Sequence, residues 1–302
     1  MFPDELFVGS DQVEYIRHAR NFASGDPGGL LDTYWPPFFP FVLGLAYLFS
    51  NDLVLPSVAV AVLFGSLAVP LIYYFVRQSY GHREGLIAGV LAVFYPHLLN
   101  SVFDLGSENV YLVLIILCLF TGWKAITSDS LLYYALAGGL VGLAYLTRPE
   151  AFAYTAFFIG VVLFRNIWKK EQFIKRSLIY GGTFLIAFLV FAAPYLVYLK
   201  GEMGRWTISS KTEINTVMGD YTNPAAVDGD RLINPTLSLR TGADLLRSFS
   251  FNMVAINKSL PYLIPLGVMI FISLGLFATD WTSTRAKREA YLISFCLLTI
   301  VG

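Results

Sequence analysis

The sequence feature that most constrains the fold is a series of long apolar stretches. A helix of roughly 20 apolar residues is long enough to cross the hydrocarbon core of a bilayer. Only 14% of the residues are charged and 56% are hydrophobic, whereas a soluble domain has about a quarter charged residues. We therefore expect an all-α, polytopic membrane protein. The predicted spans lie at about residues 53–76, 85–103, 109–124, 131–147, 151–165, 177–199 and 261–279, with a further one beginning near Tyr291.

Composition also argues against several classes of function. The formal net charge is zero, so the chain lacks the basic excess of a nucleic-acid-binding protein. Cys118 and Cys296 both lie in apolar runs and are expected to be small core residues rather than a disulfide framework. His, Cys and carboxylate residues are not spaced as metal ligands, and no glycine-rich phosphate loop is present. We expect no metal and no cofactor.

Polar breaks divide the chain into four predicted parts. Residues 1–52 form an external loop with juxtamembrane helices, and residues 53–199 form a six-helix transmembrane core. Residues 200–260 form a second external loop, and residues 261–302 contain transmembrane helices of which the last is incomplete. The apolar run at 38–49 follows three prolines and is short, which favours a juxtamembrane or re-entrant helix over a full span.

The first external loop opens with a short amphipathic helix. Ser10 or Asp11 can cap its start, and Tyr15, Ile16 and Ala19 repeat on one apolar face. Asp11 shares another face with residues 14 and 18. A carboxylate at the start of such a helix can carry out chemistry at the bilayer surface, or the helix can simply anchor the loop there.

The distribution of basic residues predicts the orientation. Short cytoplasmic loops carry an excess of Lys and Arg. The opposite short segments contain only Arg17, Arg20 and Arg148. We therefore expect a multi-pass protein of the cell (plasma) membrane with the two predicted loops and the turns at 104–108 and 148–150 outside. The basic residues assigned to the cytoplasm are Arg77, Arg83, Lys124, Arg165, Lys169, Lys170, Lys175, Arg176, Arg285, Lys287 and Arg288.

This orientation places the first residues outside without a preceding span or signal peptide. We expect that the chain is truncated at both ends, lacking a first transmembrane helix and later C-terminal spans. The alternative is a short N-terminal tail that is carried across the membrane.

Ionisable residues gather in the outer turns, where they are costly unless paired or functional. Glu108 either stabilises the start of its helix through the helix dipole or lines a site. Arg148 either pairs with Glu150 in a tight turn or binds a substrate. Lys211 and Arg205 are either solvated or functional. The full set is Asp11, Glu14, Arg17, Asp32, Asp104, Glu108, Arg148 and Glu150.

Acids and a guanidinium at one membrane surface fit glycosyl transfer from a lipid-linked phosphosugar. A carboxylate takes the proton of the acceptor hydroxyl, and a cation stabilises the leaving phosphate. A transporter or flippase of a lipid-linked sugar is the alternative, but transporters usually place their sites near the membrane midplane. An inactive truncated remnant is the third possibility.

The sequence also resembles a known family. Asp11-x-x-x-Tyr15-x-x-x-Ala19, Gly25 and Trp35-Pro36-Pro37 are similar to the first external loop of GT-C glycosyltransferases. The nearest group contains the protein O-mannosyltransferases and the lipid A aminoarabinose transferases. Further similar segments are Tyr95-Pro96 and residues 146–151. The resemblance implies a GT-C-type transmembrane helix bundle with an external loop of juxtamembrane helices.

The resemblance implies roles for three residues. It implies that Asp11 is the catalytic carboxylate, that Glu108 lines the same cavity, and that Arg148 lies near the donor phosphate. It further implies that the donor is a polyprenyl- or dolichyl-phosphate monosaccharide, that the acceptor is a hydroxyl of a protein, lipid or glycan, that the anomeric centre is inverted, and that no catalytic metal is needed. We therefore predict an inverting glycosyltransferase that acts on the outer face of the membrane.

Two positions depart from the family pattern. Gln12 stands where many relatives have a second acid, and Trp35 stands where many have a lysine near the donor phosphate. The departure at Trp35 shifts the predicted phosphate-binding role to Arg148, with Arg205 among the helpers. The other predicted substrate-binding residues are Tyr15, Arg17, Asp32, Glu108 and Lys211.

Overall fold

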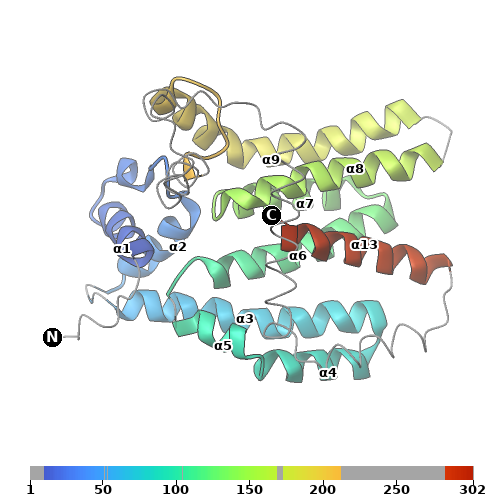
Figure 1. Ribbon diagram of the computed structural model, residues 1–302, viewed down its shortest axis with the longest axis horizontal. Coiled ribbons are helices and arrows are strands. Elements are labelled where there is room, and N and C mark those ends of the chain that lie inside the picture. The colour runs from blue at the N-terminus through green and yellow to red at the C-terminus, as the bar shows by residue number, and fades with distance from the viewer. Residues whose placement is uncertain are drawn as a thin grey trace, which may run out of the picture. The chain divides into compact units, whose positions relative to one another are not determined.

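The computed structural model describes residues 10–50, 52, 54–103, 105–168, 173–211 and 283–301 (Figure 1). The chain divides into two compact units, Met1–Lys211 and Thr212–Gly302. Every regular element within the described residues is helical, which confirms the all-α prediction. The predicted span at 261–279 lies outside the described residues, and the boundaries at 52, 199 and 260 stay predictions.

The first unit contains nine α-helices and two short 3₁₀ helices in its described residues. The second unit contributes one described helix, α13 (Ser283–Val301). The elements of the first unit are α1 (Ser10–Ala23), η2 (Pro27–Leu30), α2 (Phe38–Tyr47), α3 (Leu55–Tyr80), α4 (His82–Val93), α5 (Pro96–Phe103), α6 (Glu108–Ser128), α7 (Leu131–Tyr145), η3 (Pro149–Ala151), α8 (Phe152–Trp168) and α9 (Phe173–Met203).

Three helices in the described part of the chain, α3, α6 and α9, are long and apolar enough to cross a membrane. The predicted span at 85–103 is instead a bent pair, because α4 and α5 meet at an angle of 48°. Pro96 lacks a backbone N–H and disfavours helical conformation in the residue before it, so the helix breaks there. Helix α2 has 10 residues and rises only about 15 Å, too little for a full span.

Helices α1 and α2 pack as a pair at one end of the long helices (Figure 1). The predicted apolar face of α1 is buried: Tyr15, Ile16 and Ala19 are each at most 6% exposed. The two helices approach closely at Gly44, where an added Cβ would lie 3.0 Å from the Ala19 carbonyl oxygen. Helix α1 ends before Gly25, whose φ of 94° is in the left-handed region that favours glycine.

Helix α7 packs most extensively against α9, and glycine makes this close packing possible. A Cβ at Gly138 would lie 2.1 Å from the backbone oxygen of Phe184, and one at Gly142 would lie 2.9 Å from that of Phe188. Small residues let membrane helices approach backbone to backbone in this way. The packing fixes the end of α7, from which the chain turns into η3.

Candidate active site

A cavity of about 290 Å³ opens where the start of α1, the start of α6, the turn from α7 into η3 and the segment after α9 meet. Its lining is mostly polar and comes from parts of the sequence up to 200 residues apart. The lining residues are Asp11, Gln12, Tyr15, Pro36, Gly106, Ser107, Glu108, Thr147, Arg148, Pro149, Glu150 and Lys211.

Helix α1 contributes a carboxylate and a phenol to the cavity. Asp11 lies in its first turn with an exposed side chain. Tyr15 is one turn further on and only 5% exposed, and its ring packs edge-on against Trp35 and Phe39. Burial raises the pKa of Tyr15 to about 12, although a hydrogen bond with the Ser107 side chain partly offsets the rise. Tyr15 is therefore a neutral hydrogen-bonding group at physiological pH.

The turn after α7 brings Arg148 between two acids. Its Nη1 donates a hydrogen bond of 2.9 Å to Glu108 Oε1, and its Nε lies 3.8 Å from Glu150 Oε2. The guanidinium also lies 5.7 Å from the ring centroid of Tyr111. Burial lowers the pKa of Arg148, but the neighbouring carboxylates Glu108 and Glu150 outweigh it and raise the pKa above its usual value. Arg148 is therefore permanently charged.

Local sequence explains how this pair forms. Pro149 favours extended backbone in the preceding residue, and Arg148 has φ −147° and ψ 128°, so the chain leaves α7 at this point. Glu108 is the first residue of α6, where the helix dipole favours an acid. A Cβ at Gly106 would lie 2.1 Å from Glu108 Oε2, so glycine at this position leaves room for the carboxylate.

Lys211 enters the cavity from the segment that follows α9. Its Nζ lies 5.4 Å from the ring centroid of Tyr34 and 5.2 Å from that of Trp35, within the range of cation–π attraction. Its backbone N–H donates to Ser209 Oγ at 3.0 Å. The ammonium therefore lies against the ring of Trp35, where the resemblance led us to expect a departure from the family pattern.

Long-range hydrogen bonds hold this segment in place. The Tyr145 hydroxyl donates to the Ile208 carbonyl at 2.7 Å, and the Ser210 hydroxyl donates to the Thr33 carbonyl at 2.6 Å. The Tyr195 hydroxyl donates to the Asp32 carbonyl at 2.9 Å. Helices α7 and α9 thus fix both the aromatic rings and the lysine that lies on them.

Two predicted substrate-binding residues do not line the cavity. Arg17 Nε donates to Glu14 Oε2 at 2.8 Å on the exposed side of α1. Asp32 Oδ1 accepts hydrogen bonds from the backbone N–H groups of Tyr34 and Trp35, at 2.7 and 3.0 Å. Arg17 thus forms an ion pair on the helix surface, and Asp32 shapes the loop that presents the aromatic rings.

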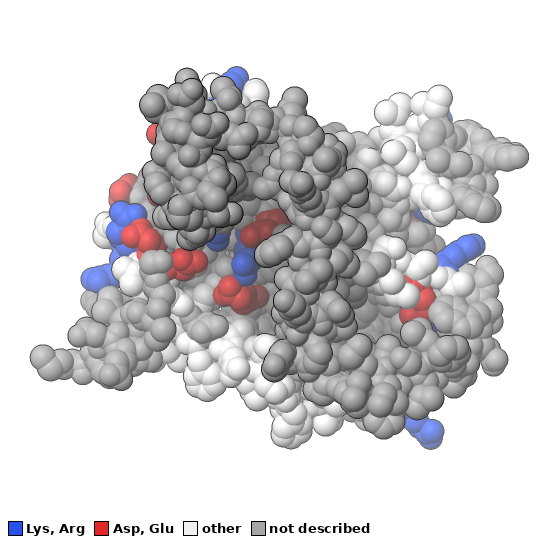
Figure 2. Space-filling model, viewed as in Figure 1, with Lys and Arg blue, Asp and Glu red and all other residues white. Residues whose placement is uncertain are grey.

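The structure therefore brings together five of the seven predicted site residues, Asp11, Tyr15, Glu108, Arg148 and Lys211, in one cavity. Their individual roles stay predictions. Glu150 and Ser107 were not predicted as site residues. The position of Glu150 in the same turn as Arg148 could have indicated it. Acidic and basic side chains lie side by side in the left half of Figure 2. Asp104 lies outside the described residues.

The described residues also contain no group of three or more His, Cys, Asp or Glu side chains placed to hold a metal ion. Two acids of the cavity, Glu108 and Glu150, contact Arg148.

Comparison with known proteins gives one match. The model of the dolichyl-phosphate-mannose-protein mannosyltransferase family matches residues 35–198, which is more than half of the chain. No curated protein and no solved structure matches. The matched segment includes Glu108 and Arg148, whereas Asp11 and Lys211 lie outside it. In agreement with the resemblance seen in the sequence, the chain is an integral membrane glycosyltransferase that belongs to the dolichyl-phosphate-mannose-protein mannosyltransferase family.

Proposed function

We propose that the protein transfers a monosaccharide from a polyprenyl- or dolichyl-phosphate donor to an acceptor hydroxyl at the outer face of the cell membrane, with inversion at the anomeric carbon. The observation that carries the proposal is the cavity itself. It combines the carboxylate of Asp11 with the cations Arg148 and Lys211 at one end of apolar helices, where the lipid tail of a donor can lie beside the helices.

Asp11 acts as the general base. Its carboxylate takes the proton of the acceptor hydroxyl while the hydroxyl oxygen attacks the anomeric carbon and the bond from that carbon to the phosphate oxygen breaks. A single displacement of this kind inverts the anomeric centre. The position of Asp11 supports the role, because it is exposed in the first turn of α1 and lines the cavity.

Arg148 and Lys211 have different roles toward the donor phosphate in this proposal. Arg148 is already bracketed by Glu108 and Glu150, so its charge is largely balanced. Among the described residues, Lys211 has ring contacts and no carboxylate partner. We therefore assign the direct contact with the donor phosphate to Lys211. Arg148 holds Glu108 in place to orient a sugar hydroxyl and adds positive charge to the developing phosphate.

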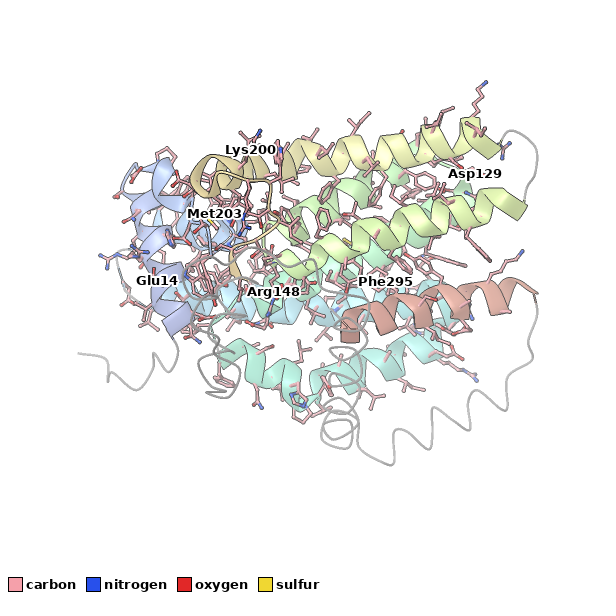
Figure 3. The ribbon with its side chains drawn as sticks, turned by 45° about the horizontal axis from the view of Figure 1, so that its top comes forward. Glu14, Asp129, Arg148, Lys200, Met203 and Phe295 are labelled. Carbon is pink, nitrogen blue, oxygen red and sulfur yellow. The ribbon has the colours of Figure 1, made fainter. Side chains whose placement is uncertain are left out.

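The basic residues at the end of the helices away from the cavity support the proposed orientation in the membrane. Figure 3 places Glu14 and Arg148 toward one end and Asp129 at the other. Arg165 pairs with Asp129. Arg77 lies in the last turn of α3, and Lys124 lies four residues before the end of α6, the helix that leads to Asp129. Basic ends face the cytoplasm, which supports a cavity on the outer side.

The test is transfer by the full chain in reconstituted vesicles that contain a defined polyprenyl-phosphate mannose and a membrane extract as the source of acceptors. Products are identified by mass spectrometry. Asp11→Asn should lower transfer by about 10²- to 10⁴-fold while the protein stays folded. Asp26→Asn, at a surface acid outside the cavity, is the matched control.

Full transfer by Asp11→Asn would remove the proposed mechanism. Movement of the labelled sugar across the vesicle membrane without a new glycosidic bond would instead identify a flippase or transporter.

A further inference from the structure

A buried histidine ties α1 to the loop that follows it. The His18 side chain is 6% exposed, and its Nδ1 lies 2.6 Å from the carbonyl oxygen of Gly29. A carbonyl oxygen can only accept a hydrogen bond, so Nδ1 must carry the proton. This hydrogen bond is therefore available to both the neutral and the protonated ring.

The other ring nitrogen, Nε2, lies near three charged side chains. His18 Nε2 lies 3.8 Å from Asp32 Oδ2 and 3.9 Å from Glu14 Oε2, and Arg17 Nη2 lies 3.5 Å away. Asp32 uses its other oxygen, Oδ1, to accept from the backbone that leads into Trp35. His18 thus lies between the helix that carries Asp11 and the acid that shapes the aromatic loop.

The position of His18 along α1 matters for Asp11. The two residues are seven positions apart, which is about two helical turns and about 10 Å of rise, and Tyr15 lies between them. Asp11 is in the first turn of α1, and residues 1–9 before it are outside the described residues. A rotation or slide of α1 relative to the loop moves the carboxylate, and a misplacement of about 1 Å can cost about 100-fold in rate.

We propose that His18 is a positioning residue for the transfer reaction: its Nδ1–H bond to Gly29 fixes the rotation and height of α1, so that Asp11 reaches the acceptor hydroxyl. The inference rests on the proposed base role of Asp11. The family match begins at residue 35 and does not cover this part of the chain.

Three variants separate the hydrogen bond from other roles of the ring. His18→Ala removes it and should lower kcat by about 10- to 100-fold, with the KM for polyprenyl-phosphate mannose within about threefold, because Asp32 still caps the loop through Oδ1. His18→Asn places an amide N–H near the position of Nδ1 and should restore kcat to within about threefold. His18→Gln reaches toward the Nε2 position and should not restore it.

The readouts distinguish positioning from folding. All rates are normalised to the folded fraction, measured by size-exclusion chromatography and thermal unfolding. Val13→Ala, at a half-exposed position of the same helix, is the matched control and should behave as wild type. The pH profile of His18→Asn should parallel that of wild type, because the Nδ1–H bond exists in both charge states of the ring.

The proposal is overturned if His18→Ala retains wild-type kcat, or if His18→Asn loses as much activity as His18→Gln. The same result follows if the whole loss disappears on normalisation to folded protein. If His18→Ala does not fold, the comparison of His18→Asn with His18→Gln still decides. Asp11→Asn is assayed in parallel: an active Asp11→Asn variant refutes the base role, whereas an inactive one with a fully active His18→Ala refutes only the positioning role.

Discussion

The two ends of the helix bundle both contain an arginine paired with a carboxylate, but in different surroundings. At the cavity end, Arg148 contacts Glu108 and Glu150 and its side chain is 32% exposed. At the opposite end, Arg165 contacts Asp129 and donates to the Tyr134 hydroxyl at 2.9 Å, and its side chain is 14% exposed. Arg148 lines a cavity with further polar groups, whereas Arg165, on α8, binds Asp129 in the turn between α6 and α7. The same pair of residue types therefore occurs in two different surroundings, and we expect only the pair in the cavity to act on the substrate.

The sharpest test of this comparison substitutes both arginines. Arg148→Ala leaves two carboxylates without their cation in the cavity and should lower kcat/KM by about 10²- to 10³-fold. Arg165→Ala should leave the rate per folded molecule within about twofold. It should destabilise the protein by about 1–2 kcal/mol, because it removes a partly solvated ion pair with Asp129 and the hydrogen bond to Tyr134. Transfer rates and thermal unfolding of both variants provide the measurement. If both variants lost transfer rate equally, the Arg148 pair would have no role in the reaction that the Arg165 pair lacks.

A second matched pair compares two lysines that lie on aromatic rings. Lys200 Nζ lies 4.4 Å from the Trp206 ring centroid, and neither residue lines the cavity. Lys211 lies against the Trp35 ring and does line the cavity. Lys211→Ala should raise the KM for polyprenyl-phosphate mannose by about 10- to 100-fold, because it removes a charge-assisted contact with the phosphate. Lys200→Ala should leave KM unchanged. If Lys211→Ala leaves the KM unchanged, Arg148 rather than Lys211 would be the residue that contacts the donor phosphate.

The α7–α9 packing connects the two ends and can be tested through two glycines. Gly138→Ala puts a methyl group against the Phe184 backbone and should destabilise the protein by about 1–3 kcal/mol. Gly160→Ala on α8 meets nothing within 4 Å and should be neutral or slightly stabilising, because alanine favours a helix. Thermal unfolding in detergent measures both variants. A neutral Gly138→Ala would mean that the two helices can separate without cost.

The smallest effect is expected at Tyr15. Its pKa is raised from 10.0 to about 12, so the folded state favours the neutral phenol. This contribution to stability is complete below pH 10 and is lost as the pH rises from 10 toward 12, where only the unfolded chain ionises readily. Tyr15→Phe should cost about 1 kcal/mol at pH 8 through the lost hydrogen bond and lose less stability than wild type between pH 10 and 12. Unfolding temperatures at pH 8 and pH 11 test this, and an identical alkaline loss in both proteins would contradict it.

The sequence predicted the helical membrane architecture and the convergence of the start of α1 with the turns before α6 and after α7, because both follow from local pattern. Apolar length predicts the spans, and alternation of direction predicts that the starts of α1 and α6 and the end of α7 lie at the same end of the helices. Asp11, Glu108 and Arg148 could therefore be expected near one another. The break at Pro96 could also have been expected from proline chemistry, although the prediction gave one continuous span.

The other features depend on contacts between distant segments and could not be predicted. Lys211 reaches the Trp35 ring only because Ser210 bonds to Thr33 and Tyr145 bonds to Ile208. His18 is buried only because the loop after α1 folds back and brings the Gly29 carbonyl to it. No local pattern records which backbone carbonyl a side chain will meet 11 or 177 residues away.

One backbone contact also bears on how the protein positions its substrates. The N–H of Phe38, at the start of α2, donates to the carbonyl of Leu146, just after the end of α7, at 2.8 Å. Since α1 packs on α2, this bond joins the helix that carries the carboxylate to the helix that ends at the arginine. This bond and the α1–α2 packing limit the movement of the carboxylate relative to the arginine. We expect the donor and the acceptor to be positioned by this preformed arrangement of carboxylate and guanidinium, without closure of the site around them.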